Sequence, residues 1–157
     1  MDTIKELREK TGLSLSQIKK ALDEAGQDKE KALVILAQYS EAQAEKKADR
    51  EITAGIIASY VHGSGTIGVL LELGCETDFV AKNEEFVALA KDLAMHVCAM
   101  SPTSINNEDG LGEETSLLHQ TFIKDPSLTV EQRLQSAIQK FGENTKVARF
   151  TRYGIGV

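Results

Sequence analysis

The stretch that decides the fold is residues 55–74, which read GIIASYVHGSGTIGVLLELG. Its first segment, 56–61, is rich in β-branched and aromatic side chains, and its second, 66–73, is an almost continuous apolar run. Both patterns are typical of β-strands. Between them, Gly63-Ser64-Gly65 supplies the residue types that tight turns use. We therefore expect a β-hairpin here.

The residues that follow the hairpin predict an α+β core. Residues 83–100 carry an apolar stripe at helical spacing, typical of a helix that lies on a sheet, made of Phe86, Leu89, Ala90, Leu93, Val97 and Met100. Residues 113–120 are weakly helical, and residues 130–141 are helical with Gly142 as the C-terminal cap. Residues 145–153 read as a last strand. The predicted fold class is α+β, with a three-stranded antiparallel sheet packed by helices.

Residues 1–39 read as a small N-terminal domain of three short amphipathic helices, of the UBA-like kind. The helix boundaries carry capping or breaking residues: Ser14 or Ser16 and Asp28 at N-termini, and Gly12 and Gly26 at C-termini. A unit of about forty residues is small for an independent core, so its stability should be marginal.

A boundary is expected after this domain. Residues 40–53 are helix-prone, and 40–50 are polar on nearly every side, which favours a solvated helical linker. The α+β core then covers residues 54–157.

Composition indicates a folded protein without nucleic acid or membrane as a partner. The chain has 157 residues, of which 41% are hydrophobic and 27% charged, and a net charge of -6 with no basic block to meet phosphates. No apolar run approaches the ~18–20 residues of a membrane helix. The first residues alternate in charge where a secretory signal would be apolar, and two cysteines are too few for a disulfide scaffold. We therefore expect a cytoplasmic protein.

Residues 63–68, GSGTIG, match the dinucleotide fingerprint G-x-G-x-x-G. That motif needs a strand before it and a helix after it, whereas here the second strand of a hairpin follows. The sequence has no P-loop either. We therefore expect no nucleotide cofactor of its own.

Cys75, Cys98, His62 and His96 are the candidate metal ligands or nucleophile and base. Their spacing matches no zinc motif, and a lone buried cysteine usually behaves as a small hydrophobic residue. A catalytic cysteine would need an activating histidine, and separation along the chain does not establish that pairing. We expect neither a metal site nor a catalytic site, and an enzyme built on these residues stays a rival hypothesis.

The segment Thr77-Asp78-Phe79-Val80-Ala81-Lys82-Asn83 follows the end of the second strand. Thr77 is a helix-capping residue type, Asp78 favours a helix N-terminus, and Phe79 is a large apolar side chain in an expected exposed loop. Phe79 either folds under the next helix as a hydrophobic staple or anchors a partner. The residues alone favour the staple.

The chain resembles the elongation factor Ts family, the guanine-nucleotide exchange factors for elongation factor Tu. The segments that carry this resemblance are residues 5–12 with 19–22, 44–50, 75–83, and 141–144 with 147–150. The stretch 75–83 is the most distinctive, and it shifts the balance for Phe79 toward a partner anchor.

The resemblance implies a factor without covalent chemistry and without a cofactor. It would bind elongation factor Tu with GDP, disturb the Mg²⁺ and phosphate site, and allow GTP to rebind. It carries over three sets of contact residues: Thr77, Asp78, Phe79 and Val80 near the Mg²⁺ site, Arg8, Leu15 and Ser16 in N-terminal docking, and His62 in the hairpin turn, contacting from a second core copy.

Two departures from the family pattern matter. Longer members contain two core copies and a coiled-coil excursion, whereas this chain has room for one core and only a loop and a weak helix between Ser101 and Lys124. The resemblance therefore implies a homodimer. The second departure is Leu15-Ser16, where many members carry two methionines, so a flexible apolar contact is partly lost.

A third hypothesis is a helical-domain adaptor without exchange activity. Such a protein would bind partner peptides through the apolar side chains Leu15, Ile18 and Leu22.

Overall fold

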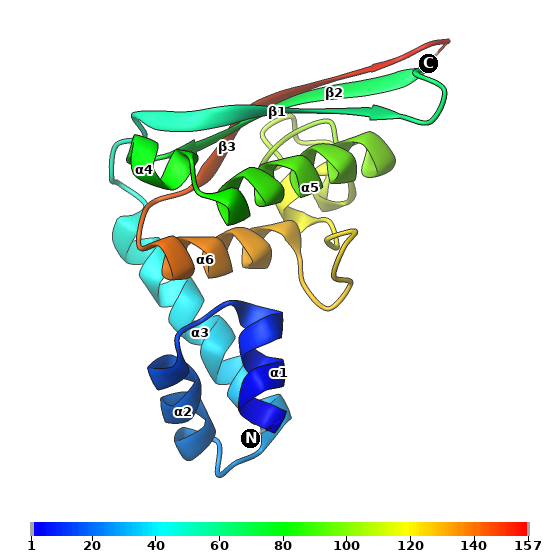
Figure 1. The fold of residues 1–157 in the computed structure, drawn as a ribbon. Coiled ribbons are helices and arrows are strands. Elements are labelled where there is room, and N and C mark those ends of the chain that lie inside the picture. Colours follow the sequence, from blue (N-terminus) through cyan, green and yellow to red (C-terminus); the bar gives the residue numbers. More distant parts are fainter. Residues whose placement is uncertain (1, 157) are drawn as a thin grey trace.

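A computed structural model describes residues 2–156. Its elements are α1 (Asp2–Thr11), α2 (Leu15–Glu24), α3 (Lys29–Lys47), β1 (Ala54–His62), β2 (Ile67–Cys75), α4 (Asp78–Ala81), α5 (Glu84–Met100), the 3₁₀ turns η1 (Glu113–Thr115) and η2 (Leu117–His119), α6 (Val130–Phe141) and β3 (Lys146–Gly154). Figure 1 shows the sheet at one side of the molecule, with α4 and α5 against one of its faces. Helix α6 lies beyond α5, and α1 and α2 lie farthest from the sheet. The fold is α+β, as predicted.

The sheet has the order β1-β2-β3, and both pairings are antiparallel. The hairpin register runs from Ala54 opposite Cys75 to His62 opposite Ile67. Gly63 and Gly65 in its turn have φ angles of 51° and 85°, which glycine adopts without steric cost. The second strand of a hairpin therefore follows the G-x-G-x-x-G match, so this segment does not have the context of a dinucleotide fold.

Helix α5 contributes more buried residues to the core beneath the sheet than any other element. Phe86, Leu89, Leu93 and Val97 lie on its buried face and belong to one cluster with the inward side chains of β2. Full burial of each such side chain contributes about 1.5–3 kcal/mol. The predicted stripe is therefore correct up to Val97, whereas Met100 at its end is 44% exposed.

The three N-terminal helices have a separate apolar cluster, built on Leu7, Leu13, Ile18, Leu22 and Leu36. Of the two candidate caps for α2, the structure uses Ser14, whose hydroxyl accepts from the Gln17 N–H while the Gln17 side chain accepts from the Ser14 N–H. Asp28 caps α3 as expected.

Helix α3 does not end near residue 39 but continues to Lys47 and packs against α6. Ser40, which we expected at the start of a solvated linker, is buried, and its hydroxyl donates to Gln139 Oε1 at 2.5 Å. The polarity pattern missed this contact because a small hydroxyl side chain lets two helices approach and satisfies its own hydrogen bond.

The segment between α5 and α6 contains less helix than expected. The weak helix predicted over residues 113–120 is two successive 3₁₀ turns, η1 and η2. No helix within residues 2–156 is both long and apolar enough to cross a membrane.

Candidate functional site

The candidate site is α4, a single helical turn between β2 and α5. Sequence analysis predicted an exposed loop here, but Asp78–Ala81 form a turn of helix that Thr77 caps, its hydroxyl accepting from the Val80 N–H at 3.4 Å. Val80 and Ala81 are buried, whereas Asp78 and Phe79 are exposed. The turn therefore holds to the core by one side and presents Asp78 and Phe79 on the other.

Phe79 does not fold back under the neighbouring helix. Its side chain is 89% exposed, which is incompatible with a hydrophobic staple, because a staple buries its aromatic ring. The staple hypothesis that the residues alone favoured is wrong.

Glu143 supports this turn from the loop between α6 and β3. Its Oε1 accepts from the backbone N–H groups of Glu76, at 3.1 Å, and Thr77, at 3.0 Å. Its Oε2 accepts from the Thr77 hydroxyl at 2.7 Å. Sequence analysis missed Glu143 as a site residue. The only signal was its place in the family segment 141–144, because the contact joins residues more than sixty positions apart.

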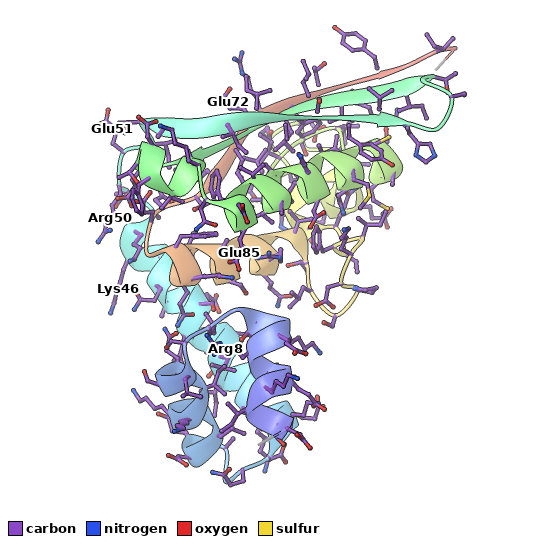
Figure 2. The ribbon with its side chains drawn as sticks, viewed as in Figure 1. Arg8, Lys46, Arg50, Glu51, Glu72 and Glu85 are labelled. Carbon is purple, nitrogen blue, oxygen red and sulfur yellow. The ribbon has the colours of Figure 1, made fainter. Side chains whose placement is uncertain are left out.

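A reciprocal set of bonds ties the same region to the end of α3. The Asn144 N–H donates to Glu76 Oε1 at 2.7 Å, and the buried Asn144 amide donates to the carbonyls of Ala48 and Arg50 at 3.3 and 2.8 Å. Arg50 also pairs with Glu76 at 3.6 Å. Figure 2 labels Arg50 close to α4, at the end of the sheet where α3 meets the core.

Cys75 lies directly before the turn but has the environment of a packed thiol. It is fully buried, and its Sγ donates to the Thr77 carbonyl at 3.2 Å. Burial, and next the negative charge of Glu143, raise the pKa of the Cys75 thiol. A raised pKa makes the nucleophilic thiolate scarcer, so this environment favours a structural role.

His96 is also buried, on α5. Its Nε2 bonds Gln120 Oε1 at 3.0 Å, and its Nδ1 accepts from the Ile123 N–H at 3.1 Å, so both ring nitrogens hold the segment before α6. Burial lowers the pKa of His96 and favours the neutral ring. Within residues 2–156, no three His, Cys, Asp or Glu side chains gather as metal ligands would.

The residues that the family resemblance implies for N-terminal docking lie on a second surface. Arg8 and Ser16 are exposed and line an open cleft of about 970 Å³ between α1, α2 and the core. Leu15, 45% exposed, lies beside Ser16 at the start of α2. Arg8 and Glu85 mark the two sides of the cleft in Figure 2, and Glu85 pairs there with Lys140.

The apolar stripe that an adaptor would use is not available for peptides. Ile18 and Leu22 are 0% and 3% exposed, because they build the core of the N-terminal helices. Only Leu15 of the three side chains is open to a partner.

His62 lies far from Phe79 within one chain. Figure 1 shows α4 and the hairpin turn at opposite ends of the sheet. A strand rises about 3.3 Å per residue, and β1 spans nine residues up to His62. Tyr60 Oη contacts His62 Nδ1 at 3.1 Å, on the exposed end of the hairpin.

No described helix covers the outer face of the sheet (Figure 1). This face is partly apolar. Its exposed side chains include Ile57 at 64%, Val61 at 64%, Leu70 at 51% and Tyr153 at 76%. Glu72 and Arg149 form an ion pair on the same face, near α4. This is a surface of mixed character that a second protein molecule could cover.

The fold joins a small helical domain to an α+β core, and an exposed phenylalanine lies on a turn that Glu143 supports. These features define a class of protein whose candidate site is a surface for contact with another molecule. The model of the Elongation factor TS family matches residues 5–111. Elongation factor Ts of Thermotoga petrophila is 43% identical over 190 positions, covering 99% of this chain and 96% of the relative. Elongation factor Ts of Carboxydothermus hydrogenoformans is 40% identical over 189 positions, covering 98% and 87%. The chain belongs to the elongation factor Ts family.

Family membership makes this chain a translation elongation factor, with elongation factor Tu as the partner that the family implies. The alignments extend over 189 and 190 positions, against 157 residues here, so these relatives carry additional residues within the aligned region.

Proposed function

We propose that this chain binds elongation factor Tu with GDP and promotes GDP release, so that GTP rebinds. The Phe79 turn inserts near the Mg²⁺ and phosphate site of the partner. The observation that carries this proposal is the 89% exposure of Phe79 on a turn that is anchored to the core by the buried side chains of Val80 and Ala81. When a rigid scaffold keeps an aromatic side chain in water, burial of that side chain becomes favourable only when a partner covers it.

The magnitude suits nucleotide exchange. Burial of a phenylalanine contributes about 1.5–3 kcal/mol, and each ~1.4 kcal/mol is a tenfold change in an equilibrium constant. Phe79 can therefore lower the affinity of elongation factor Tu for GDP about ten- to a hundredfold, if its ring is buried only in the complex that has lost the nucleotide. By thermodynamic reciprocity, bound GDP must lower the affinity of elongation factor Tu for this chain by the same factor.

Asp78 is the electrostatic companion of Phe79 in this proposal. Its carboxylate lies in the first turn of α4, exposed beside the phenylalanine. A carboxylate brought next to a bound Mg²⁺ disturbs the water and cation arrangement that holds the GDP phosphates. The effect requires no covalent step and no cofactor, so the chain acts as an exchange factor and not as an enzyme.

Docking through the N-terminal domain supplies the affinity that precedes insertion. Arg8, Leu15 and Ser16 present the contact, and α3 connects it to the core. Because α3 packs on α6, the docking surface has a defined position relative to the Phe79 turn. In this division residues 1–39 dock, 40–53 connect, and 54–157 form the core.

A homodimer completes the proposal. Two copies that join their outer sheet faces would bury Ile57, Leu70 and Tyr153. His62 would then contact the partner from the second copy, because within one chain it lies at the opposite end of the sheet from α4. The chain acts in the cytoplasm with elongation factor Tu and takes no part in direct nucleic-acid or membrane binding.

The experiment that tests the proposal is the release of fluorescently labelled GDP from elongation factor Tu with Mg²⁺ and excess unlabelled GDP present. We expect release to accelerate with the concentration of this chain. Equal rates with and without the chain, in a mixture where binding is detected, would reject exchange and leave a protein that binds elongation factor Tu without releasing its nucleotide.

A further inference from the structure

We propose that Glu143 is a positioning residue for Phe79: its carboxylate holds the α4 turn in the orientation that exchange needs. This inference rests on the proposed function, because it assigns a role in placing the residue that enters the partner. Glu143 itself lies in the loop between α6 and β3 and does not belong to the exposed surface of the turn.

The first step is the end of β2. Cys75 is the last residue of that strand, and the next two backbone N–H groups, of Glu76 and Thr77, both donate to Glu143 Oε1. Hydrogen bonds to a charged acceptor are about twice as strong as neutral ones. The carboxylate therefore fixes the direction in which the chain leaves the sheet.

The second step is the cap of α4. A hydroxyl has one proton, and the Thr77 hydroxyl donates it to Glu143 Oε2 at 2.7 Å. The oxygen is then left to accept from the Val80 N–H. Glu143 thus leaves the Thr77 hydroxyl oxygen free to accept, as capping requires. Phe79 lies between Thr77 and Val80, the two residues that the capping hydrogen bond joins.

The third step is the weakness of the turn without this support. A four-residue helix is not stable by itself, because the first turn fixes several residues for one hydrogen bond. Val80 and Ala81 attach one side of it to the core. The Thr77 cap and the Glu143 carboxylate fix the rotation of the α4 turn about its axis. They thereby set the direction of the Phe79 ring.

The carboxylate is itself held in place. Gly142, with φ of 72°, ends α6 immediately before it, and Asn144 is buried immediately after it in hydrogen bonds to Glu76, Ala48 and Arg50. Neighbours fixed on both sides allow Glu143 to orient the turn and not merely to follow it.

The first test needs no partner. The chain contains no tryptophan, so Phe79→Trp creates a single tryptophan emitter on the turn. In that background we expect Glu143→Ala to lower the fluorescence anisotropy, and Glu143→Gln to lower it less, because an amide oxygen still accepts from both N–H groups. Gln120→Ala is the matched control, since it removes buried hydrogen bonds near the other end of α5. Unchanged anisotropy in Glu143→Ala, equal to the control, would overturn the proposal.

The second test is the maximal rate of labelled GDP release at saturating chain, measured below the melting temperature of every variant. We expect Glu143→Ala to slow this rate about tenfold, because the turn loses all three hydrogen bonds to the carboxylate and then holds Phe79 in the productive orientation only part of the time. In a Phe79→Ala background the fractional loss should be much smaller, because Glu143 acts mainly through Phe79 and only Asp78 is left on the turn to be displaced.

Equal fractional losses in both backgrounds would overturn the positioning role and leave Glu143 as a stabilising residue only. If Glu143→Ala does not fold, Glu143→Gln carries the same comparison with a smaller effect. A parent chain that leaves GDP release unchanged overturns the proposed function and the role in exchange, while the anisotropy still decides whether Glu143 holds the turn.

Discussion

Phe79 and Phe86 lie seven residues apart and have opposite environments. Phe79 is 89% exposed on α4, whereas Phe86 is fully buried on α5 and packs edge-on to Phe141 with ring centroids 5.9 Å apart. A side chain that contributes to folding must lose its contact with water on folding. Phe79 therefore contributes little to the stability of the isolated chain.

This contrast predicts opposite stability effects for one kind of substitution. Phe79→Ala should melt within about 1 °C of the parent, since surface changes alter stability by less than about 0.5 kcal/mol. Phe86→Ala should melt on the order of 10 °C lower, because a core phenylalanine costs about 3–5 kcal/mol. Thermal unfolding followed by circular dichroism measures both. A large loss for Phe79→Ala would show that its ring packs in solution.

His96 should make stability depend on pH. Its pKa is lowered in the folded chain, so below about pH 6.5 the unfolded state binds the proton more readily and the folded state loses stability. The loss is at most about 1.4 kcal/mol per pH unit from this residue, and it ends once the pH falls below the pKa of the folded chain. No loss from His96 is expected above pH 7.

The measurement is urea unfolding at pH 7 and pH 5 for the parent and for His96→Gln. Carboxylates also titrate in this range, so the comparison is the difference between the two proteins. The parent should lose more stability than the variant. Equal losses would mean that folding does not lower the pKa of His96, which contradicts the expectation from its burial.

At the scale of elements, Leu15 opens α2 with its side chain half in water, while Ile18 of the same helix is fully buried. One helix thus contributes to the core of its domain and leaves the side chain of its first residue partly exposed. Leu15→Asp should weaken binding to elongation factor Tu by about tenfold while the chain stays folded, because it removes part of an apolar contact and adds a charge to be desolvated.

Val34→Asp is the control for this change, because Val34 is 58% exposed on α3 and lies outside the docking residues. Titration calorimetry with elongation factor Tu compares the two variants. Similar affinities for the two would mean that the contact lies elsewhere on the N-terminal helices.

The elements themselves could largely be predicted, because their patterns are local. The hairpin, α5 and α6 follow from periodicity within each segment and from turn and cap residues such as Gly142. The helical state of residues 40–47 follows from their helix-prone sequence. Their packing against α6 and the burial of Ser40 could not be predicted, because both depend on a distant segment. The α4 turn is too short to produce a helical period.

The candidate site divides in the same way. Thr77 is readable as a cap because capping is a contact within three residues. The hydrogen bond between Glu143 and Thr77 could not be predicted from the sequence, because it forms only when β2 and the loop before β3 come together. The exposure of Phe79 likewise depends on which side of α4 meets the core, and the residues alone favoured the opposite answer.

In the molecule as a whole, one face of the sheet is left uncovered by the described helices (Figure 1). Helices cover one face, and Leu70 lies on the open face at the middle of the central strand, opposite Ser59 and Thr151. A second copy on this face would form a two-sheet sandwich, the usual way in which an apolar sheet face is covered.

Light scattering at micromolar concentration should therefore give twice the chain mass of 17.1 kDa. Leu70→Asp should give a folded monomer, because it places a charge at the centre of the buried face. Leu111→Asp, a change at a 70% exposed loop side chain, should remain dimeric. A parent chain that scatters with the mass of one copy would contradict the dimer.

The role of Phe79 in exchange is tested by the rate of labelled GDP release from elongation factor Tu at a subsaturating concentration of three proteins: the parent, Phe79→Ala and Leu111→Ala. We expect the parent and Leu111→Ala to accelerate release equally, and Phe79→Ala to be about ten- to a hundredfold less effective. Phe79→Ala with the parental rate, below its melting temperature, would contradict the claim that this exposed ring drives exchange.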